Sequence, residues 1–344
     1  METFERLNEQ QLNDILSKIG KVKIGMVGDL CIDIYWKADM TRSELSRETP
    51  HFPLPIVEER MSPGGGGNVV VNMAALHPAR TEAIGVIGND WRGKALLSTL
   101  QNHGIGDSGV VISDNLITNA YCKPVRKGFS DVAYEDPRLD FCNYEPLPKA
   151  AEQALLARLE QAVKELDVLC VSDQFRYGCI TPAVREQLIG YAAGGLTVIV
   201  DSRNQTGEYR SVLMKPNEIE AWSVVHGGLF PPQGGSLDVY AEMAERLVQI
   251  NGAPVCVTIG ANGCLYSDGR QTTHVAAYPV KPPIDIVGAG DTFLAAFGSA
   301  LGAGMAPLVA ASFGNLASSV TVKKIGTTGT ASPQELKERL RTAE

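Results

Sequence analysis

The chain has 344 residues, of which 44% are hydrophobic and 20% are charged, and its formal net charge is -8. This composition is that of a globular protein with one large α/β domain or two smaller ones. The acidic balance argues against a dedicated nucleic-acid-binding protein, which needs a basic face.

The sequence contains no signal peptide and no run of eighteen apolar residues, so we expect no membrane contact. Its seven cysteines are scattered and form no Cys-x-x-Cys pair. This pattern is typical of reduced thiols, and it predicts a cytoplasmic protein.

Apolar residues at helical spacing near the N-terminus predict a helix over residues 4–19, and "KIGMVGD" predicts a buried strand that ends at Asp29. Segments 34–60 and 110–142 are proline-rich or β-like and interrupt the pattern that follows. We expect both to form a small β lid.

Strands and helices alternate through the rest of the chain, from the glycine run "GGGGNVVVNMAAL" to the final helices after Gly290. This alternation predicts a single α/β domain over residues 1–344 with a doubly wound, mainly parallel sheet. Ligands bind such sheets beyond the carboxyl ends of the strands, where Asp29, Asp173, Asp201 and Gly260 are expected.

The stretch "DIVGAGDTF" places Asp285 and Asp291 on either side of a Gly-Ala-Gly turn. A dinucleotide fingerprint is excluded because Phe293 stands at its third glycine position. A plain structural turn is one interpretation. The stronger one is an anion site at a helix start, with Asp291 as a general base and the amides of Ala289, Gly290 and Asp291 stabilising a phosphoryl group.

Three further motifs each have two interpretations, one functional and one structural. In "PGGGGNVVVNMA", Asn68 and the glycines suit either sugar contact or turn formation. Asp29 and Asp33 suit sugar hydroxyls or helix capping. Asn217 and Glu220 of "KPNEIEA" suit a water-mediated Mg²⁺ site or an ordinary capping pattern.

Other sites are disfavoured by the sequence. "GNDWRGKA" at 88–95 lacks the Ser or Thr of a phosphate-binding P-loop, since Ala95 follows the lysine. The five histidines are scattered, and no zinc-binding or His-x-Gly-His motif occurs.

Taken in order, "GGGGNVVVNMAAL", "KPNEIE", "TIGANGCLYS" and "DIVGAGDTFLAAF" resemble the ribokinase-like (PfkB) carbohydrate kinases over nearly the whole chain. The resemblance implies a three-layer α/β/α fold with a β lid. It also implies a sugar kinase that uses ATP and Mg²⁺, binds K⁺ as a monovalent cation and forms a homodimer through the lid.

The resemblance also implies a role for each motif residue. The catalytic set is Asp291 with an anion hole of Gly288, Ala289 and Gly290. The sugar or sugar phosphate would be bound by Asp29, Asp33, Gly65, Gly66, Asn68, Arg126 and Arg138. The nucleotide would lie near Asn217, Thr258, Gly260, Gly263 and Asn315. Asn217 and Glu220 would organise Mg²⁺ through water, and backbone around Asp285 and Val287 would hold the monovalent cation.

The stretches "LNEQQLNDILSKIGKVKIGMVGD", "TRSELSRETPHFPLPIVEE" and "RLDF" are similar to the kinase half of bacterial heptose-7-phosphate kinase/adenylyltransferases, which phosphorylate the anomeric hydroxyl of a heptose phosphate for lipopolysaccharide synthesis. We expect the kinase half alone. A substrate phosphate needs cations, and the candidates are Arg42, Arg47, Lys123, Arg126, Arg138, Arg176 and Arg203.

Two departures leave the sugar open. "QFRYG" stands where the heptose kinases usually have a Tyr-Ala-Lys-Gly-like segment, and "VDSR" replaces Asp-Pro-Lys. The alternatives are therefore a kinase for ribose, fructose or a hexose phosphate, or a non-catalytic sugar or nucleotide sensor on the same fold.

Overall fold

A ten-stranded sheet forms the centre of the molecule in the computed structural model, which describes residues 1–228, 231 and 235–342. In spatial order its strands are β1 (Glu2–Phe4), β15 (Thr272–Val275), β14 (Cys264–Ser267), β13 (Val255–Thr258), β12 (Leu213–Met214), β11 (Thr197–Ser202), β10 (Val168–Asp173), β2 (Lys23–Gly28), β5 (Arg80–Gly88) and β6 (Gly106–Ser113).

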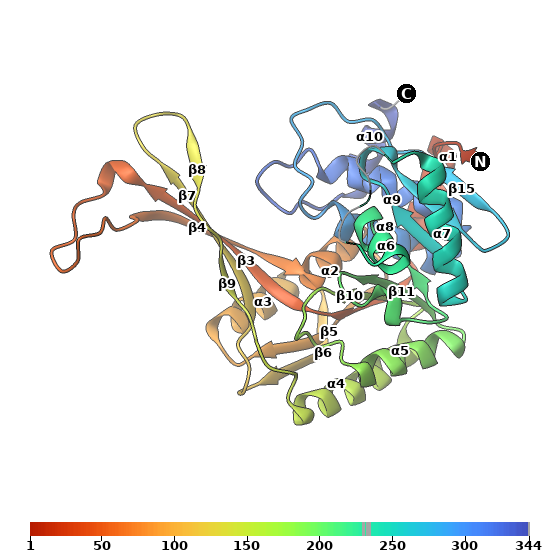
Figure 1. The fold of residues 1–344 in the computed structure, drawn as a ribbon, viewed down its shortest axis with the longest axis horizontal. Coiled ribbons are helices and arrows are strands. Elements are labelled where there is room, and N and C mark those ends of the chain that lie inside the picture. The colour runs from red at the N-terminus through yellow and green to blue at the C-terminus, as the bar shows by residue number, and fades with distance from the viewer. Residues whose placement is uncertain (229–230, 232–234, 343–344) are drawn as a thin grey trace.

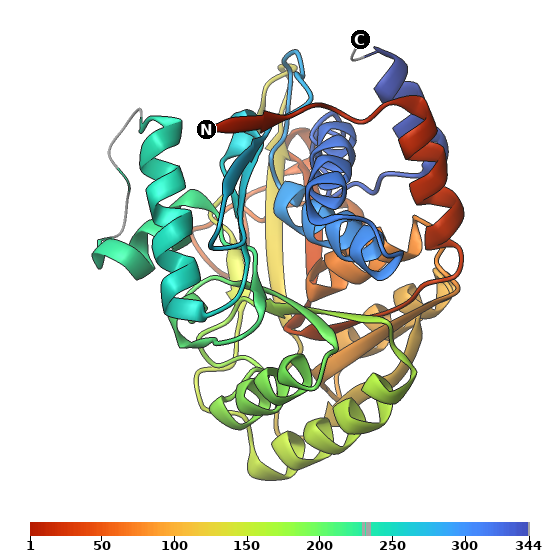
Figure 2. The ribbon, with the colours of Figure 1, turned by 90° about the vertical axis from the view of Figure 1, so that its right-hand side faces the viewer.

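Helices cover both faces of this sheet, as Figure 2 shows from the side. One face packs against α1 (Glu9–Ile19), α2 (Gly66–Ala74), α3 (Trp91–Asn102), α8 (Ala289–Gly302), α9 (Pro307–Thr321) and α10 (Pro333–Thr342). The other packs against α4 (Lys149–Ala162), α5 (Pro182–Ala193), α6 (Glu218–His226) and α7 (Leu237–Asn251). The predicted three-layer, doubly wound fold is confirmed.

Two details of the prediction were wrong. Residues 4–8 are not helical: Glu2–Phe4 pairs with β15, and α1 begins only after Asn8, whose side chain accepts a hydrogen bond from the Gln11 amide. The segment "PVCVTIGANGCLYS" does not continue the alternation of strands and helices: β14 runs antiparallel to both β13 and β15, because the short turn Gly260–Asn262 leaves no room for a crossover helix.

A second, five-stranded sheet projects from the body (Figure 1). Its strands are β3 (Leu30–Asp39), β4 (Ile56–Gly65), β7 (Asn119–Lys127), β8 (Ala133–Glu135) and β9 (Leu139–Phe141). We call this sheet with its loops, residues 30–65 and 119–141, the arm. At its base Ile32, Ile34, Ala120 and Cys122 pack with Ala95 of α3.

The arm overlaps the two expected lid segments, with one correction. Residues 110–113 belong to β6, which pairs with β5 in the large sheet. The segment 110–142 therefore contributes to the arm only from β7 onward.

The strand order reverses between β2 and β10. From β2 the chain moves outward through β5 to β6, and from β10 it moves the other way through β11. Such a reversal opens a crevice at the carboxyl ends of the strands. No helix among the described residues is long and apolar enough to cross a membrane.

Candidate active site

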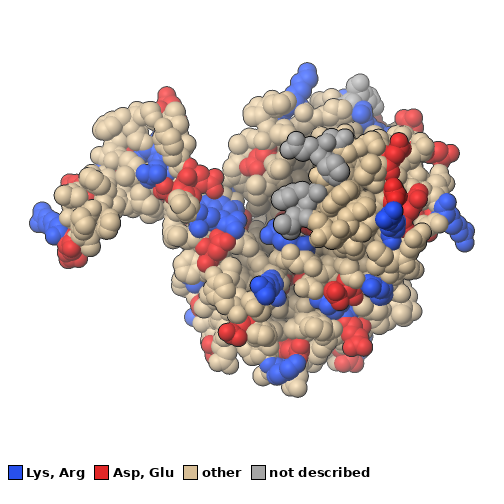
Figure 3. Space-filling model, viewed as in Figure 1, with Lys and Arg blue, Asp and Glu red and all other residues tan. Residues whose placement is uncertain are grey.

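A cavity of about 430 Å³ lies at these strand ends, between the base of the arm and the N-terminus of α8. Lys and Arg side chains gather where the arm meets the body (Figure 3). Among the predicted site residues, those that line the cavity are Asp33, Gly65, Asn68, Arg138, Asn217, Glu220, Thr258, Gly260, Gly263, Val287, Gly288, Ala289, Gly290, Asp291 and Asn315.

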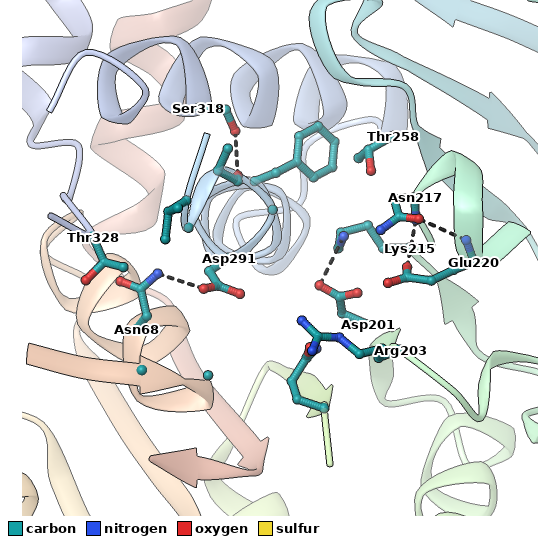
Figure 4. A pocket seen from close by; sticks show the side chains of 18 of the residues that line it. Asn68, Asp201, Arg203, Lys215, Asn217, Glu220, Thr258, Asp291, Ser318 and Thr328 are labelled. Carbon is teal, nitrogen blue, oxygen red and sulfur yellow. Dashed lines mark hydrogen bonds and ion pairs between the residues drawn. The ribbon is translucent and has the colours of Figure 1, made fainter. Parts of the chain in front are cut away.

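Asp291 lies in the first turn of α8, is partly buried and lines the cavity. Asn68 Nδ2 donates a 2.7 Å hydrogen bond to its Oδ2 (Figure 4). Burial raises the pKa of Asp291 to about 7, the Asn68 hydrogen bond opposes this rise, and the charge of Asp201 adds to it. A carboxylate with this pKa can accept a proton near neutral pH.

The helix start leaves amide groups free to bind an anion. Gly288 begins α8 with a φ of 79°, and no side chain caps the helix. The Ala289 amide donates to the Ile286 carbonyl, whereas the Gly290 and Asp291 amides have no acceptor in the described part of the chain. The Gly288 amide also has no acceptor among these residues, so two of the three amides of the expected Gly288–Gly290 hole are free, and the Asp291 amide is a third free donor.

One end of the cavity is bounded by the arm and by the segment after β10. Lys123 and Asp33 form a 2.8 Å ion pair there. Tyr121 of the arm meets Phe175 of the body edge-to-face, with ring centroids 6.1 Å apart. The guanidinium of Arg138 lies 4.1 Å from the Tyr121 ring. This end therefore combines an aromatic wall with cationic side chains that are paired with carboxylates.

Arg203 also lines the cavity and, within the described ranges, forms no ion pair with a carboxylate. The other predicted cations are engaged or lie elsewhere. Arg42 pairs with Asp39, and Arg138 pairs with Asp140 while still lining the cavity. Arg126 pairs with Asp136 and does not line the cavity. Arg47 and Arg176 do not line it either.

Asp29 was expected to contact the ligand, but it does not line the cavity. Its carboxylate accepts hydrogen bonds of 2.7–2.8 Å from the backbone amides of Gln174, Phe175 and Cys179. Any side chain at Gly178 would collide with this carboxylate, 2.2 Å from its oxygen. Asp29 thus holds the segment that carries Gln174 and Phe175 to the cavity wall.

Two more predicted residues lie outside the cavity. Gly66 packs against Met26 at the start of α2. The Asp285 carboxylate accepts hydrogen bonds from the Val287 and Gly326 amides. Lys323 Nζ donates to the carbonyls of Lys281 and Pro283, which lie in the same loop as Asp285. The loop before α8 is therefore held by several polar contacts.

Asn217 and Glu220 form a capping box at the start of α6 (Figure 4). The Asn217 side chain accepts from the Ile219 and Glu220 amides, and Glu220 Oε2 accepts from the Asn217 amide. Burial, then repulsion from Asp201, raises the pKa of Glu220 to about 7. Among the described residues no group of three His, Cys, Asp or Glu side chains could hold a metal ion directly. The oxygens of Asn217 and Glu220 are of the kind that Mg²⁺ prefers, and they fit an ion held through water.

The remaining residues at this end are Thr258, Gly260, Gly263, Asn315 and Ser318. The Asn315 amide donates to the carbonyls of Val275 and Ala276, so it also fixes the end of β15. Ser318 Oγ donates to the Ala289 carbonyl and ties α9 to the start of α8.

The sequence analysis missed the buried pair formed by Lys215 and Asp201, whose Nζ and Oδ2 lie 3.1 Å apart. It also missed Tyr121 in the wall. Lys215 carried a signal as the first residue of "KPNEIE". Gln174, Phe175 and Asp201 belong to "QFRYG" and "VDSR", which the sequence analysis named only as departures from the heptose kinases.

The family model described as pfkB family carbohydrate kinase matches residues 26–335. Two curated relatives carry the name Bifunctional protein HldE. The one from Hydrogenovibrio crunogenus is 30% identical over 327 residues, 93% of this chain and 63% of that protein. The one from Caulobacter sp. is 31% identical over 331 residues, 92% of this chain and 63% of that protein. The chain thus spans less than two thirds of their length.

Solved structures share the fold. Arabidopsis thaliana ribokinase complexed with ribose and ATP has a TM-score of 0.68 at 20% identity, covering 93% of this chain and 99% of that chain. Phosphofructokinase-2 from Escherichia coli in complex with potassium has a TM-score of 0.71 at 23% identity, covering 94% of this chain and 99% of that chain. The fold is ribokinase-like.

Proposed function

The chain belongs to the pfkB family of carbohydrate kinases, and we propose that it transfers the γ-phosphoryl group of ATP to a sugar phosphate with Asp291 as the general base. The observation that carries this proposal is the position of Asp291. Its carboxylate, with a pKa near 7, lies beside two free helix amides at the floor of the cavity.

The chemistry follows from that arrangement. The Asp291 carboxylate takes the proton of the acceptor hydroxyl, whose oxygen forms a bond to the γ-phosphorus as the bond to the bridging oxygen of ADP breaks. The Gly290 and Asp291 amides donate to the oxygens on which charge develops. Because these donors are fixed by the helix, they need no reorganisation during transfer.

Two cations accompany the proposal. Asn217 and Glu220 would hold Mg²⁺ through water, and the ion would neutralise charge on the ATP phosphates. A monovalent cation at the backbone of Asp285 and Val287 would further order the loop before α8. The potassium in the phosphofructokinase-2 structure supports this second site by analogy alone.

We favour D-glycero-D-manno-heptose 7-phosphate, phosphorylated at its anomeric hydroxyl, as the acceptor. The relatives named HldE and the motifs similar to heptose-7-phosphate kinases support this choice. Arg203 supports it independently, because it faces the cavity without a carboxylate partner in the described part of the chain and can bind a substrate phosphate. Ribose, fructose and hexose phosphates are the alternative acceptors.

We also propose that two copies associate through their arms. The arm exposes large apolar side chains, including Leu45, Phe52, Phe129 and Tyr134, and the 97% exposure of Phe129 is the highest of them. Apolar side chains gathered on a projecting sheet favour burial against another protein surface.

The test is an acceptor screen with ATP and Mg²⁺, read as ADP release, on the wild type and Asp291→Asn. We expect turnover with the heptose phosphate in the wild type, and a loss of about 10³-fold in kcat for Asp291→Asn with ATP affinity retained. A different preferred sugar would overturn the heptose assignment alone. Tight sugar binding with no turnover by the wild type would instead favour a sensor.

A further inference from the structure

Lys215 has a buried ammonium group, although it caps no helix and a charged group is costly to bury. Lys215 follows β12 directly, and the residue is only 2% exposed. Its Nζ pairs with Asp201, and no other salt bridge joins it within the described ranges. Removing an ammonium group from water costs several kcal/mol, and one carboxylate rarely offsets that cost.

Lys215 faces the free amides of α8. A methyl group placed on Gly290 would lie 4.0 Å from Lys215 Nζ, which is its nearest contact outside the start of α8. Figure 4 shows the side chain lying between Asp291 and the Asn217–Glu220 pair, with its nitrogen toward Asp201. The ammonium group and the Gly290 amide therefore adjoin the same volume of the cavity.

The group carries its charge. Burial lowers the pKa of Lys215, but the neighbouring Asp201 and Glu220 carboxylates raise it further, so the net direction is upward. A buried positive charge beside two unpaired amides, at the wall of one cavity, is a strong site for a developing anion.

We propose that Lys215 is a catalytic residue that donates from Nζ to an oxygen of the transferring phosphoryl group. This inference rests on the proposed kinase function. While the acceptor oxygen bonds to the γ-phosphorus and the bridging bond to ADP breaks, the acceptor proton goes to Asp291 and Lys215 keeps its own proton. Its ammonium group neutralises charge that the leaving ADP and the phosphoryl oxygens share.

The first test compares the wild type with Lys215→Met, which keeps the length of the side chain and removes its charge. We expect kcat to fall about 10²–10³-fold while KM for ATP changes little, because the contact strengthens in the transition state. Binding of ADP with Mg²⁺ and aluminium fluoride, a mimic of the transferring phosphoryl group, should weaken by a similar factor. Binding of ADP alone should change little.

The matched control is Arg80→Met, which also breaks an ion pair to a buried carboxylate, that of Glu82, away from the cavity. It should lower the melting temperature and leave kcat and aluminium fluoride binding unchanged. If Lys215→Met fails to fold, Lys215→Ala assayed with added ethylammonium replaces it. Rescue of turnover by the amine is the expected result.

Two outcomes overturn the assignment. In one, Lys215→Met turns over within threefold of the wild type. In the other, it loses ADP and ADP–aluminium fluoride binding equally, as a purely structural pair would. If the wild type itself neither turns over any sugar nor binds ADP–aluminium fluoride, the kinase function fails and this inference fails with it.

Discussion

At the scale of single residues, the orientation of the Asp291 carboxylate depends on a chain of polar side chains between α2 and α8. Thr292 Oγ1 donates to Asn72 Oδ1, and Asn72 Nδ2 donates to Asn68 Oδ1. Because the Asn68 oxygen is engaged, its Nδ2 is the atom turned toward Asp291. The chain thus gives the base a hydrogen-bond donor, which favours its ionised form.

The first prediction concerns the pH dependence of turnover. The carboxylate must be ionised to accept a proton, so kcat/KM should rise with pH through about 7, the pKa of Asp291. Asn68→Ala removes a hydrogen bond that lowers this pKa, so the rise should move to higher pH by about one unit. Full pH–rate profiles measure the shift.

A control for this prediction is Thr258→Val, at the other end of the cavity. It should leave the position of the rise unchanged. An unshifted profile for Asn68→Ala would show that Asp291 is not the titrating base.

At the scale of elements, two glycines at the start of α8 have different tasks. Gly288 has a φ of 79°, and a Cβ there would lie 2.8 Å from Asn68 Nδ2. Gly290 has space around it but lies at the free amides. Gly288 is needed because its backbone conformation and the nearby Asn68 side chain disfavour a Cβ atom, whereas Gly290 keeps the anion site open.

Exchanging each glycine for alanine should separate these tasks. Gly288→Ala should reduce the free energy of unfolding by about 1 kcal/mol or more, since the left-handed conformation is strained for alanine. Gly290→Ala should fold at least as stably as the wild type but bind ATP and turn over more weakly. Urea unfolding and steady-state kinetics measure the two effects, and equal stability losses would contradict this division.

Another element depends on Asp29, whose carboxylate holds the backbone of the 174–179 segment. Asp29→Ala should leave these amides without an acceptor and reduce the free energy of unfolding by about 3 kcal/mol. KM for the sugar should rise more than KM for ATP, because Gln174 and Phe175 line the end of the cavity next to the arm, where we expect the sugar to bind. An unchanged amide hydrogen exchange rate in this segment would contradict the prediction.

At the scale of the whole molecule, the arm and the body meet at the end of the cavity that Tyr121 and Phe175 line. Arg60 of β4 donates to Thr327 Oγ1 and to the Gly326 carbonyl of the body. Gly326 also donates to Asp285, in the loop before α8. The base of the arm is therefore joined to the loop that leads to Asp291, so association of the arms would act close to the site.

If the arms associate, light scattering should give the mass of two chains for the wild type. Phe129→Glu combined with Phe52→Glu should give a single chain, because charges replace exposed apolar side chains of the arm. Tyr144→Glu, at another exposed aromatic residue just beyond the arm, should leave the mass unchanged. A wild type with the mass of one chain would overturn the dimer.

The sequence by itself indicated the alternation of strands and helices and the glycine-rich helix starts. It also indicated which aspartate of "DIVGAGDTF" we propose as the base. Each of these depends on spacing within one short segment. Which groups meet depended on tertiary structure. Asp29 turned out to hold a loop rather than line the cavity, the Ala289 amide proved to be bonded to the Ile286 carbonyl, and Lys215 came to lie beside the free amides. Burial and contacts between distant segments decide these points, and no local pattern records them.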